Sequence, residues 1–213
     1  MQTLLSIEKE KHVSTIGYDQ HEMISNIIKL HCPDGIEADL TYSKGKFYGN
    51  KVFPPKYKFD KYPQKRGVIK ADSRDIPLLD EKIKTLMFDP PFLAGISKSD
   101  KSIITKRFTA FESMPKLWTY YNQTLKECYR VLKPLGILIF KCQDTVSCSQ
   151  QYFTHNEVMN YAVKTGFYPK DLFILLADTR IMDNRWKKQQ HARKYHCYFW
   201  VFKKERCPIK YVV

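Results

Sequence analysis

The sequence predicts an α/β fold, in which a mostly parallel sheet lies between helices. Three observations lead to this prediction. Four short segments of the N-terminal half each end in an aspartate, as strands do at the polar edge of a sheet. Helical periodicity precedes and follows these segments. Near the C-terminus, two apolar segments are joined without a helix, which predicts an antiparallel pair. The aspartates are Asp39, Asp60, Asp72 and Asp89.

The composition predicts one globular domain over residues 1–213 with a basic surface. The chain is 43% hydrophobic, and it has 36 Lys and Arg against 22 Asp and Glu, a net charge of +14. This charge favours a polyanionic partner, DNA or RNA; a merely soluble basic protein, or one attracted to an anionic membrane, is the alternative. No apolar run reaches the ~18 residues of a spanning helix, and Met1 to Lys11 lacks the apolar region of a signal peptide. We expect an intracellular, cytoplasmic protein.

The cysteines predict neither a disulfide framework nor a metal site. No two of them form a Cys-x-x-Cys pair, and they are scattered along a chain that has enough apolar residues for its own core. We expect free thiols and no metal. The cysteines are Cys32, Cys128, Cys142, Cys148, Cys197 and Cys207.

The first elements are a helix and three short strands. Apolar residues recur at helical spacing from Asp19, a plausible N-cap, to Leu30. A strand ending at Asp39 runs into a loop of small and polar residues, which include Thr41, Ser43 and Gly45. The next strand, residues 57–60, ends 21 residues further on, and an acid at that distance binds ribose hydroxyls in dinucleotide-type folds. Residues 67–72 form the third strand.

The fourth strand, residues 86–88, ends at the most informative stretch of the chain, Asp89-Pro90-Pro91-Phe92. The prolines end the strand because each lacks an N–H and fixes φ. A carboxylate and a proline carbonyl can accept the two hydrogens of an exocyclic amine, and Phe92 offers a face for a planar base. The alternative is a plain strand followed by a Pro-Pro turn.

The later elements are two helices and three strands. Residues 117–132 have one apolar face, and Pro134 ends that helix before a strand over residues 137–141. Thr154 to Glu157 reads as a capping box that opens a helix, and Gly166 closes it with a left-handed cap. Residues 171–177 and 196–202 are the last two strands.

Two basic segments are candidate nucleic-acid contacts. A loop insertion over residues 93–115 follows the strand that ends at Asp89, and a hairpin over residues 178–195 joins the last two strands. Cations interleaved with an aromatic residue suit phosphate contacts and base stacking; a solvated hairpin is the alternative. The candidates are Lys98, Lys101, Lys106, Arg107, Arg185, Trp186, Lys187, Lys188, Arg193 and Lys194.

Asp89 to Phe92 resembles motif IV, the Asp-Pro-Pro-aromatic signature of S-adenosylmethionine-dependent amino-methyltransferases that act on nucleic acid bases. With the four acidic strand ends in order, the chain resembles the small adenine-specific DNA methylases of bacteria and their phages. The resemblance implies a class I methyltransferase (Rossmann-like) fold, with a seven-stranded, mostly parallel sheet, an antiparallel last strand and helices on both faces.

The resemblance also implies a cofactor site. Asp39, Thr41, Ser43 and Gly45 would hold the methionine part of S-adenosylmethionine. Asp60 would bind the ribose, and Asp72 with Ser73 the adenine. The 39–45 loop departs from the family pattern, because Leu40 replaces a proline and only one glycine remains. A loop poor in glycine approaches a ligand less closely.

The implied reaction is methylation of an exocyclic amine, most simply N6 of adenine in DNA, on a base that has left the stack. Cytosine N4 remains open. The rival readings are an RNA base methyltransferase, a protein-glutamine methyltransferase, which fits the charge poorly, and a catalytically inactive nucleic-acid-binding subunit. The sequence names no recognition site, oligomeric state or biological role.

Overall fold

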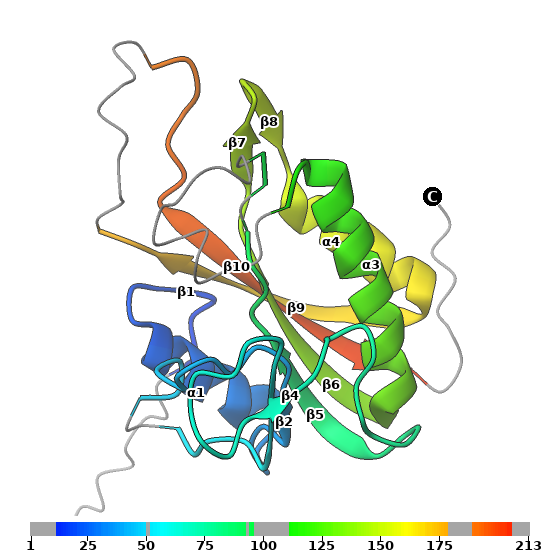
Figure 1. The fold of residues 1–213 in the computed structure, drawn as a ribbon. Coiled ribbons are helices and arrows are strands. Elements are labelled where there is room, and N and C mark those ends of the chain that lie inside the picture. The colour runs from blue at the N-terminus through cyan, green and yellow to red at the C-terminus, as the bar shows by residue number, and fades with distance from the viewer. Residues whose placement is uncertain (1–11, 50–51, 93, 96–110, 179–188, 206–213) are drawn as a thin grey trace, which may run out of the picture.

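A computed structural model describes residues 12–49, 52–92, 94–95, 111–178 and 189–205. Its main element is an eight-stranded sheet with the order β1-β9-β10-β6-β5-β2-β3-β4 (Figure 1). Neighbours from β6 to β4 are parallel, whereas β10 is antiparallel to both β6 and β9. The fold class predicted from the sequence is confirmed, including the antiparallel last strand.

The strands of the sheet are β1 (Ile16–Gly17), β2 (Ala38–Asp39), β3 (Tyr57–Asp60), β4 (Ile69–Lys70), β5 (Ile83–Phe88), β6 (Leu132–Cys142), β9 (Phe167–Leu176) and β10 (His196–Lys204). A separate hairpin consists of β7 (Thr145–Ser147) and β8 (Gln150–Tyr152). The helices are α1 (Gln20–His31), α3 (Met114–Val131) and α4 (Thr154–Thr165).

The sheet differs from the prediction in three places. It has an eighth strand, because β1 pairs with the outer edge of β9. β4 is only two residues long, since both its residues are exposed and its partner is β3 alone. β6 begins as soon as α3 ends, and Pro134 therefore lies within the strand rather than between the two elements.

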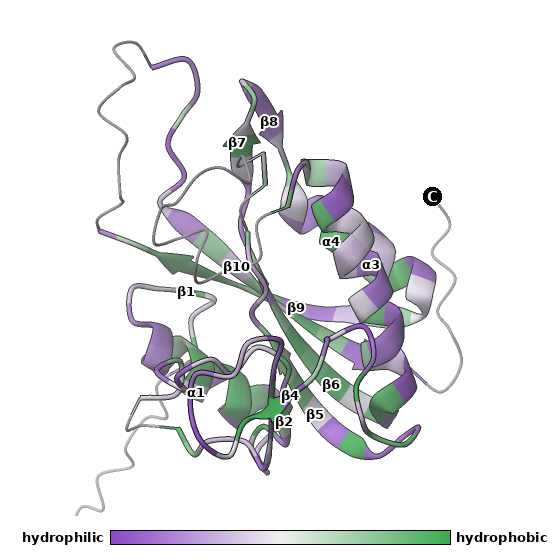
Figure 2. Ribbon diagram, in the orientation of Figure 1, coloured by the Kyte–Doolittle hydropathy of each residue, from purple (hydrophilic) through white to green (hydrophobic). Residues whose placement is uncertain are grey.

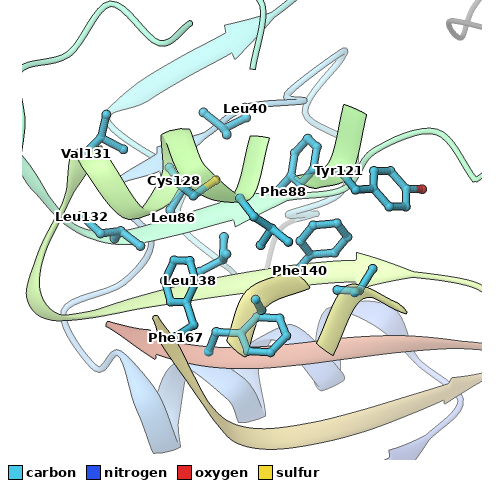
Figure 3. Close-up of a cluster of buried hydrophobic side chains, with 14 of the residues drawn as sticks. Leu40, Leu86, Phe88, Tyr121, Cys128, Val131, Leu132, Leu138, Phe140 and Phe167 are labelled. Carbon is cyan, nitrogen blue, oxygen red and sulfur yellow. The ribbon is translucent and has the colours of Figure 1, made fainter. Parts of the chain in front are cut away.

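Helices cover both faces of the sheet. On one face, α3 and α4 pack on Leu86, Phe88, Leu138 and Phe140, the core that Figure 3 shows. On the other face, α1 packs on residues of β6, β9 and β10. Figure 2 shows that apolar residues predominate in the central strands. None of the described helices has the length and apolar character needed to cross a membrane.

The helix ends test three local predictions. Asp19 is the N-cap of α1 and accepts hydrogen bonds from the His21 and Glu22 amides, as expected. Gly166 ends α4 with φ of 114°, also as expected. The capping box is wrong. The N-cap of α4 is Phe153, and the His155 amide donates instead to Asp144, a buried acid that follows β6.

The strand ends that were expected to carry function share one edge of the sheet. Asp39, at the end of β2, pairs with Lys58 of β3 and with Met87 of β5. The parallel direction therefore brings the carboxyl ends of β2, β3 and β5 to the same side. Among the described residues of the β2–β3 and β3–β4 connections there is no helix, so extended loops surround this edge.

Candidate active site

The Asp89 to Phe92 corner is bound to its surroundings on two sides. The Asp89 amide donates to the Thr41 hydroxyl at 2.9 Å, which joins the corner to the loop after β2. The Pro91 carbonyl accepts from the Tyr121 hydroxyl of α3 at 2.5 Å. No described residue donates a hydrogen bond to the Pro90 carbonyl, and Pro90 is itself buried.

The Asp89 carboxylate faces a cation. Its Oδ2 lies 3.4 Å from Lys141 Nζ, and 26% of its side chain is exposed. Burial raises the pKa of Asp89 above its ordinary value, while the charge of Lys141 and its hydrogen bond oppose that rise. Oδ1 likewise accepts no hydrogen bond from a described residue.

Three aromatic rings surround the ammonium of Lys141, near the end of β6. Its ammonium lies 5.2 Å from the ring centroid of Phe47, 5.5 Å from that of Phe199 and 5.7 Å from that of Phe92. It also donates to Gln20 Oε1 at 2.9 Å. Because only 11% of this side chain is exposed, the charge acts on Asp89 with little screening.

The loop after β2 is organised around Asp39, which is buried. Its Oδ1 accepts from the Thr41 amide at 2.7 Å, and its Oδ2 accepts from the Tyr48 hydroxyl at 2.7 Å. Burial raises the pKa of Asp39 to about 7, although these hydrogen bonds lower it. Both oxygens are therefore used inside the protein, where they hold the loop that carries Thr41.

Gly45 closes the same loop in a conformation that suits glycine, with φ of 73°. An ideal Cβ there would lie 2.5 Å from the Tyr42 hydroxyl, so the ring of Tyr42 takes the space beside it. Ser43 is also left-handed, with φ of 48°. The tight turn needs Gly45, and its close neighbour is a side chain of the loop itself.

Asp60 connects two of the loops. Its Oδ2 accepts from the Ser43 amide at 2.8 Å, and its Oδ1 accepts from the Tyr62 amide at 2.7 Å. The predicted ribose acid thus lies next to the 39–45 loop, as the resemblance requires. In this structure its two oxygens hold the backbone of the loops.

Asp72 and Ser73, the expected adenine contacts, lie in the turn after β4. Asp72 makes a two-pronged ion pair with Arg74, with distances of 2.9 and 2.8 Å, and this pairing lowers the pKa of Asp72 to about 2. Ser73 is buried, and its hydroxyl lies 2.7 Å from the Tyr120 hydroxyl of α3. Ser73 therefore anchors this turn to the helix.

Comparison with solved structures identifies the architecture. A chain of a Haloferax volcanii complex that contains the Trm112 methyltransferase activator matches with a TM-score of 0.51 and 13% identity, over 88% of this chain and 91% of that one. The N-methyltransferase NodS from Bradyrhizobium japonicum matches with a TM-score of 0.50 and 12% identity, over 87% and 96%. The fold is that of the class I methyltransferases.

The other comparisons are weaker matches or find nothing. PvuII DNA methyltransferase, which is cytosine-N4-specific, matches with a TM-score of 0.47 and 16% identity, over 65% of this chain and 49% of its own. The chain spans about half the length, 49% to 56%, of the DNA methylases that it matches. Neither family models nor curated proteins give a match.

Within this methyltransferase fold, the structure joins most of the predicted site residues. Thr41 contacts the Asp89 corner, and Ser43 contacts Asp60, so the 39–45 loop links two strand ends. Asp72 has no hydrogen bond to these residues and lies beyond β3, on the side of β4. Among the described residues, no group of three or more His, Cys, Asp or Glu is arranged to hold a metal ion.

Sequence reasoning missed Lys141, the residue whose charge faces Asp89 at the carboxyl edge of the sheet. A signal was present, because Lys141 closes the predicted strand over residues 137–141, where an unsolvated cation needs a partner. A second missed group surrounds Asp144, whose Oδ1 lies 2.8 Å from His155 Nδ1 and whose Oδ2 accepts from the Tyr198 hydroxyl at 3.4 Å.

Most of the predicted nucleic-acid contacts lie outside the described residues. These are Lys98, Lys101, Lys106 and Arg107 of the 93–115 loop and Arg185, Trp186, Lys187 and Lys188 of the 178–195 hairpin. Of the remaining two, Arg193 is exposed, and Lys194 donates to the Ala192 carbonyl at 3.0 Å. The five described cysteines are free, in agreement with the sequence prediction.

Proposed function

We propose that this chain is an intracellular S-adenosylmethionine-dependent methyltransferase that modifies an exocyclic amino group of a nucleic acid base. N6 of adenine in DNA is the proposed target. The observation that carries the proposal is the Asp89 to Phe92 corner, which lies at the carboxyl edge of a methyltransferase sheet and is hydrogen-bonded through Thr41 to the loop of the proposed cofactor site.

The corner offers what an exocyclic amine needs. The nitrogen lone pair of adenine N6 is delocalised into the ring and is a poor nucleophile. Two acceptors, Asp89 Oδ1 and the Pro90 carbonyl, would take the two amino hydrogens and favour a pyramidal nitrogen whose lone pair points at the sulfonium methyl. Phe92 would stack on the base. This is catalysis by positioning and electrostatics, and it needs no covalent intermediate.

The proton balance of the reaction follows from the same geometry. Transfer of the methyl group breaks the sulfonium C–S bond, forms the C–N bond and leaves the nitrogen with a positive charge and a proton to lose. The ionised Asp89 carboxylate, which would already accept one amino hydrogen, would take that proton and release it to solvent. An ionised Asp89 stabilises this charge as it develops. Lys141 supports the ionised form of Asp89, because it is the cation nearest to the carboxylate.

The cofactor would lie over the ends of β2 and β3. In this proposal the 39–45 loop binds the methionine part of the cofactor. The buried Asp39 carboxylate fixes the conformation of that loop through its hydrogen bonds to Thr41 and Tyr48. Asp60 would bind the ribose and Asp72 the adenine. To do so, Asp60 must release one of the backbone amides that it now accepts from and accept from a ribose hydroxyl instead. S-adenosylmethionine would supply the methyl group from its sulfonium, and the neutral thioether would be the leaving group.

The decisive experiment is transfer of tritiated methyl groups from S-adenosylmethionine to duplex DNA, single-stranded DNA and RNA, followed by nucleoside analysis. Label in N6-methyladenine from DNA is the expected result. Label in N4-methylcytosine, or in RNA alone, would correct the target and leave the reaction class in place. No transfer to any nucleic acid would contradict the proposal.

A second candidate is a nucleic-acid-binding subunit without catalytic activity. It is favoured by one observation: the 39–45 loop fills its own space, with both Asp39 oxygens bonded internally and Tyr42 packed beside Gly45. Calorimetry separates the two candidates. An enzyme binds S-adenosylmethionine, whereas an inactive subunit of this kind shows no heat of binding while it still binds nucleic acid.

A further inference from the structure

The connections between β2 and β4 carry a concentration of positive charge that the predicted motifs do not use. Residues 44–49 and 52–70 contain eight Lys and Arg and one acid, so their net charge is 8 − 1 = +7. The rest of the chain has 28 cations and 21 acids and carries the other +7. Half of the net charge therefore lies in 25 residues, on Lys44, Lys46, Lys56, Lys58, Lys61, Lys65, Arg66 and Lys70.

Contacts hold these residues on one surface, which we call the β2–β4 basic surface. Asp60 accepts from the Ser43 and Tyr62 amides and so ties the first connection to the second. The Lys58 ammonium lies 5.5 Å from the ring centroid of Tyr42, and Lys70 pairs with Asp60 in the sheet. Figure 1 shows these connections in cyan beside α1, away from α3 and α4.

The protein does not neutralise this charge. The one acid of the surface, Asp60, uses both oxygens for backbone amides. Lys61 reaches Asp72 at 3.7 Å. The other cations form no ion pair with a described residue, and Lys44, Lys46, Lys56, Lys65, Arg66 and Lys70 are exposed. Like charges at this density repel one another, and a polyanion would relieve that repulsion.

Exposed aromatic rings lie among the cations. Phe53 is 93% exposed and Tyr62 is 56% exposed, both on the same two connections. Lys61 lies 5.9 Å from the centroid of the Tyr62 ring. A surface of cations with exposed aromatic rings suits single-stranded nucleic acid, because its unpaired bases have free faces for stacking. A duplex hides those faces.

We propose that the β2–β4 basic surface binds single-stranded nucleic acid, with its cations on the phosphates and with Phe53 and Tyr62 stacked on unpaired bases. The inference rests on the proposed function for the choice of nucleic acid as the polyanion. It adds a binding surface next to Asp60, and it makes an unpaired strand, rather than intact duplex, the preferred substrate form.

The test compares two variants that lose the same charge. The first is Lys46→Gln/Lys56→Gln/Lys65→Gln/Arg66→Gln. The matched control is Lys126→Gln/Lys133→Gln/Lys164→Gln/Lys170→Gln, four exposed lysines on α3, on α4 and on strands β6 and β9. Fluorescence anisotropy measures the affinity of each protein for a labelled single strand and for its duplex, without cofactor, from 50 to 200 mM salt.

The expected difference is large. Each phosphate contact on a single strand contributes about 0.7 to the slope of log affinity against log salt, so four lost contacts flatten the slope by about 2.8. The wild type should then lose roughly 50-fold more affinity than the first variant across this salt range. The control variant should keep the wild-type slope. Phe53→Ala/Tyr62→Ala should weaken single-strand binding by roughly tenfold or more.

Four results would overturn the inference. Equal slopes for the two charge variants would show that the surface is only solvated, and would leave the proposed methyl transfer untouched. Equal affinity for duplex and single strand would refute the preference for an unpaired strand. Loss of binding to vesicles of anionic phospholipid, with nucleic-acid binding unchanged, would assign the surface to a membrane. No binding of the wild type to any nucleic acid would overturn the proposed function as well.

Discussion

Asp89 lies where three parts of the chain meet, and its chemistry depends on all of them. Thr41 fixes its amide, Lys141 faces one carboxylate oxygen, and the other oxygen accepts no hydrogen bond from a described residue. Burial raises the pKa of Asp39, and the nearby charge of Asp89 adds to that rise. Two ionised carboxylates at one edge repel each other. The Lys141 charge offsets this repulsion and so affects how readily Asp89 ionises.

Replacing Asp89 by alanine tests its role directly. Asp89→Ala should lower methyl transfer at least about 100-fold, the usual cost of losing a positioned transition-state contact. The affinity for S-adenosylmethionine should stay within a few-fold, because the proposed cofactor contacts lie on β2, β3 and β4. Rate measurements with calorimetry of cofactor binding check both. Retained turnover would refute the role, and loss of cofactor binding would show that the residue is structural.

In the proposed mechanism, Lys141 makes the reaction depend on pH in a defined direction. Activity would require an ionised Asp89, so it should fall as the pH drops through the pKa of that carboxyl. Lys141→Met removes the cation that lowers this pKa, so the acidic limb of the rate profile should move to higher pH. Lys141→Arg keeps the charge and should stay near the wild type. A pH–rate profile of the three proteins is the measurement, and an unmoved limb would exclude the coupling.

At the scale of elements, short and polar connections rather than helices form the site. β2 and β4 have two residues each. They still position Asp39 and Asp72, because parallel pairing to β3 fixes where each strand ends in the sheet. The start of α4 depends on another element, since Asp144 accepts from its His155 amide. β6 is strained near its start, where Leu135 has φ of 67°.

Leu135 offers a stabilising substitution. A left-handed conformation costs a residue with a Cβ about 1–2 kcal/mol, and glycine adopts it freely. Because 44% of Leu135 is exposed, little burial is lost with its side chain. Leu135→Gly should therefore raise the free energy of unfolding by roughly 0.5–1 kcal/mol, net of the extra chain entropy. Urea denaturation is the measurement, and Leu135→Ala, which keeps the Cβ, should give no such gain.

At the scale of the whole molecule, positive charge lies at more than one place around the sheet. The β2–β4 basic surface flanks the end of the carboxyl edge that we propose for the cofactor. The predicted 178–195 hairpin belongs to the connection from β9 to β10, at the opposite end of the strand order. A nucleic acid that reached from one to the other would cross the Asp89 corner, because β5 lies between these two ends of the sheet.

The hairpin remains a separate prediction, since residues 179–188 lie outside the described part of the chain. Lys187→Ala/Lys188→Ala should weaken binding to all DNA sequences alike. It should flatten the slope of log affinity against log salt by about two units on duplex DNA, because each phosphate contact releases about one counterion. Cofactor binding should not change. A salt titration with an unchanged slope would show that these lysines are solvated.

The sequence by itself determined the features that depend on nearby residues. The prolines end β5 after Phe88, Asp19 caps α1, and the left-handed Gly166 ends α4, because each effect acts within a few residues. The order of acidic strand ends also predicted the fold class and most of the residues that meet at the carboxyl edge.

The tertiary structure alone decided which distant residues touch. Lys141 meets Asp89 from 52 positions away because β5 and β6 are neighbours in the sheet, and no local pattern encodes that pairing. Asp144, rather than Thr154, accepts from the His155 amide in the first turn of α4, because β6 brings a buried acid to the helix start. The basic charges of residues 44–49 and 52–70 become one surface for the same reason: β3 pairs with β2 and β4, and Asp60 ties their loops together.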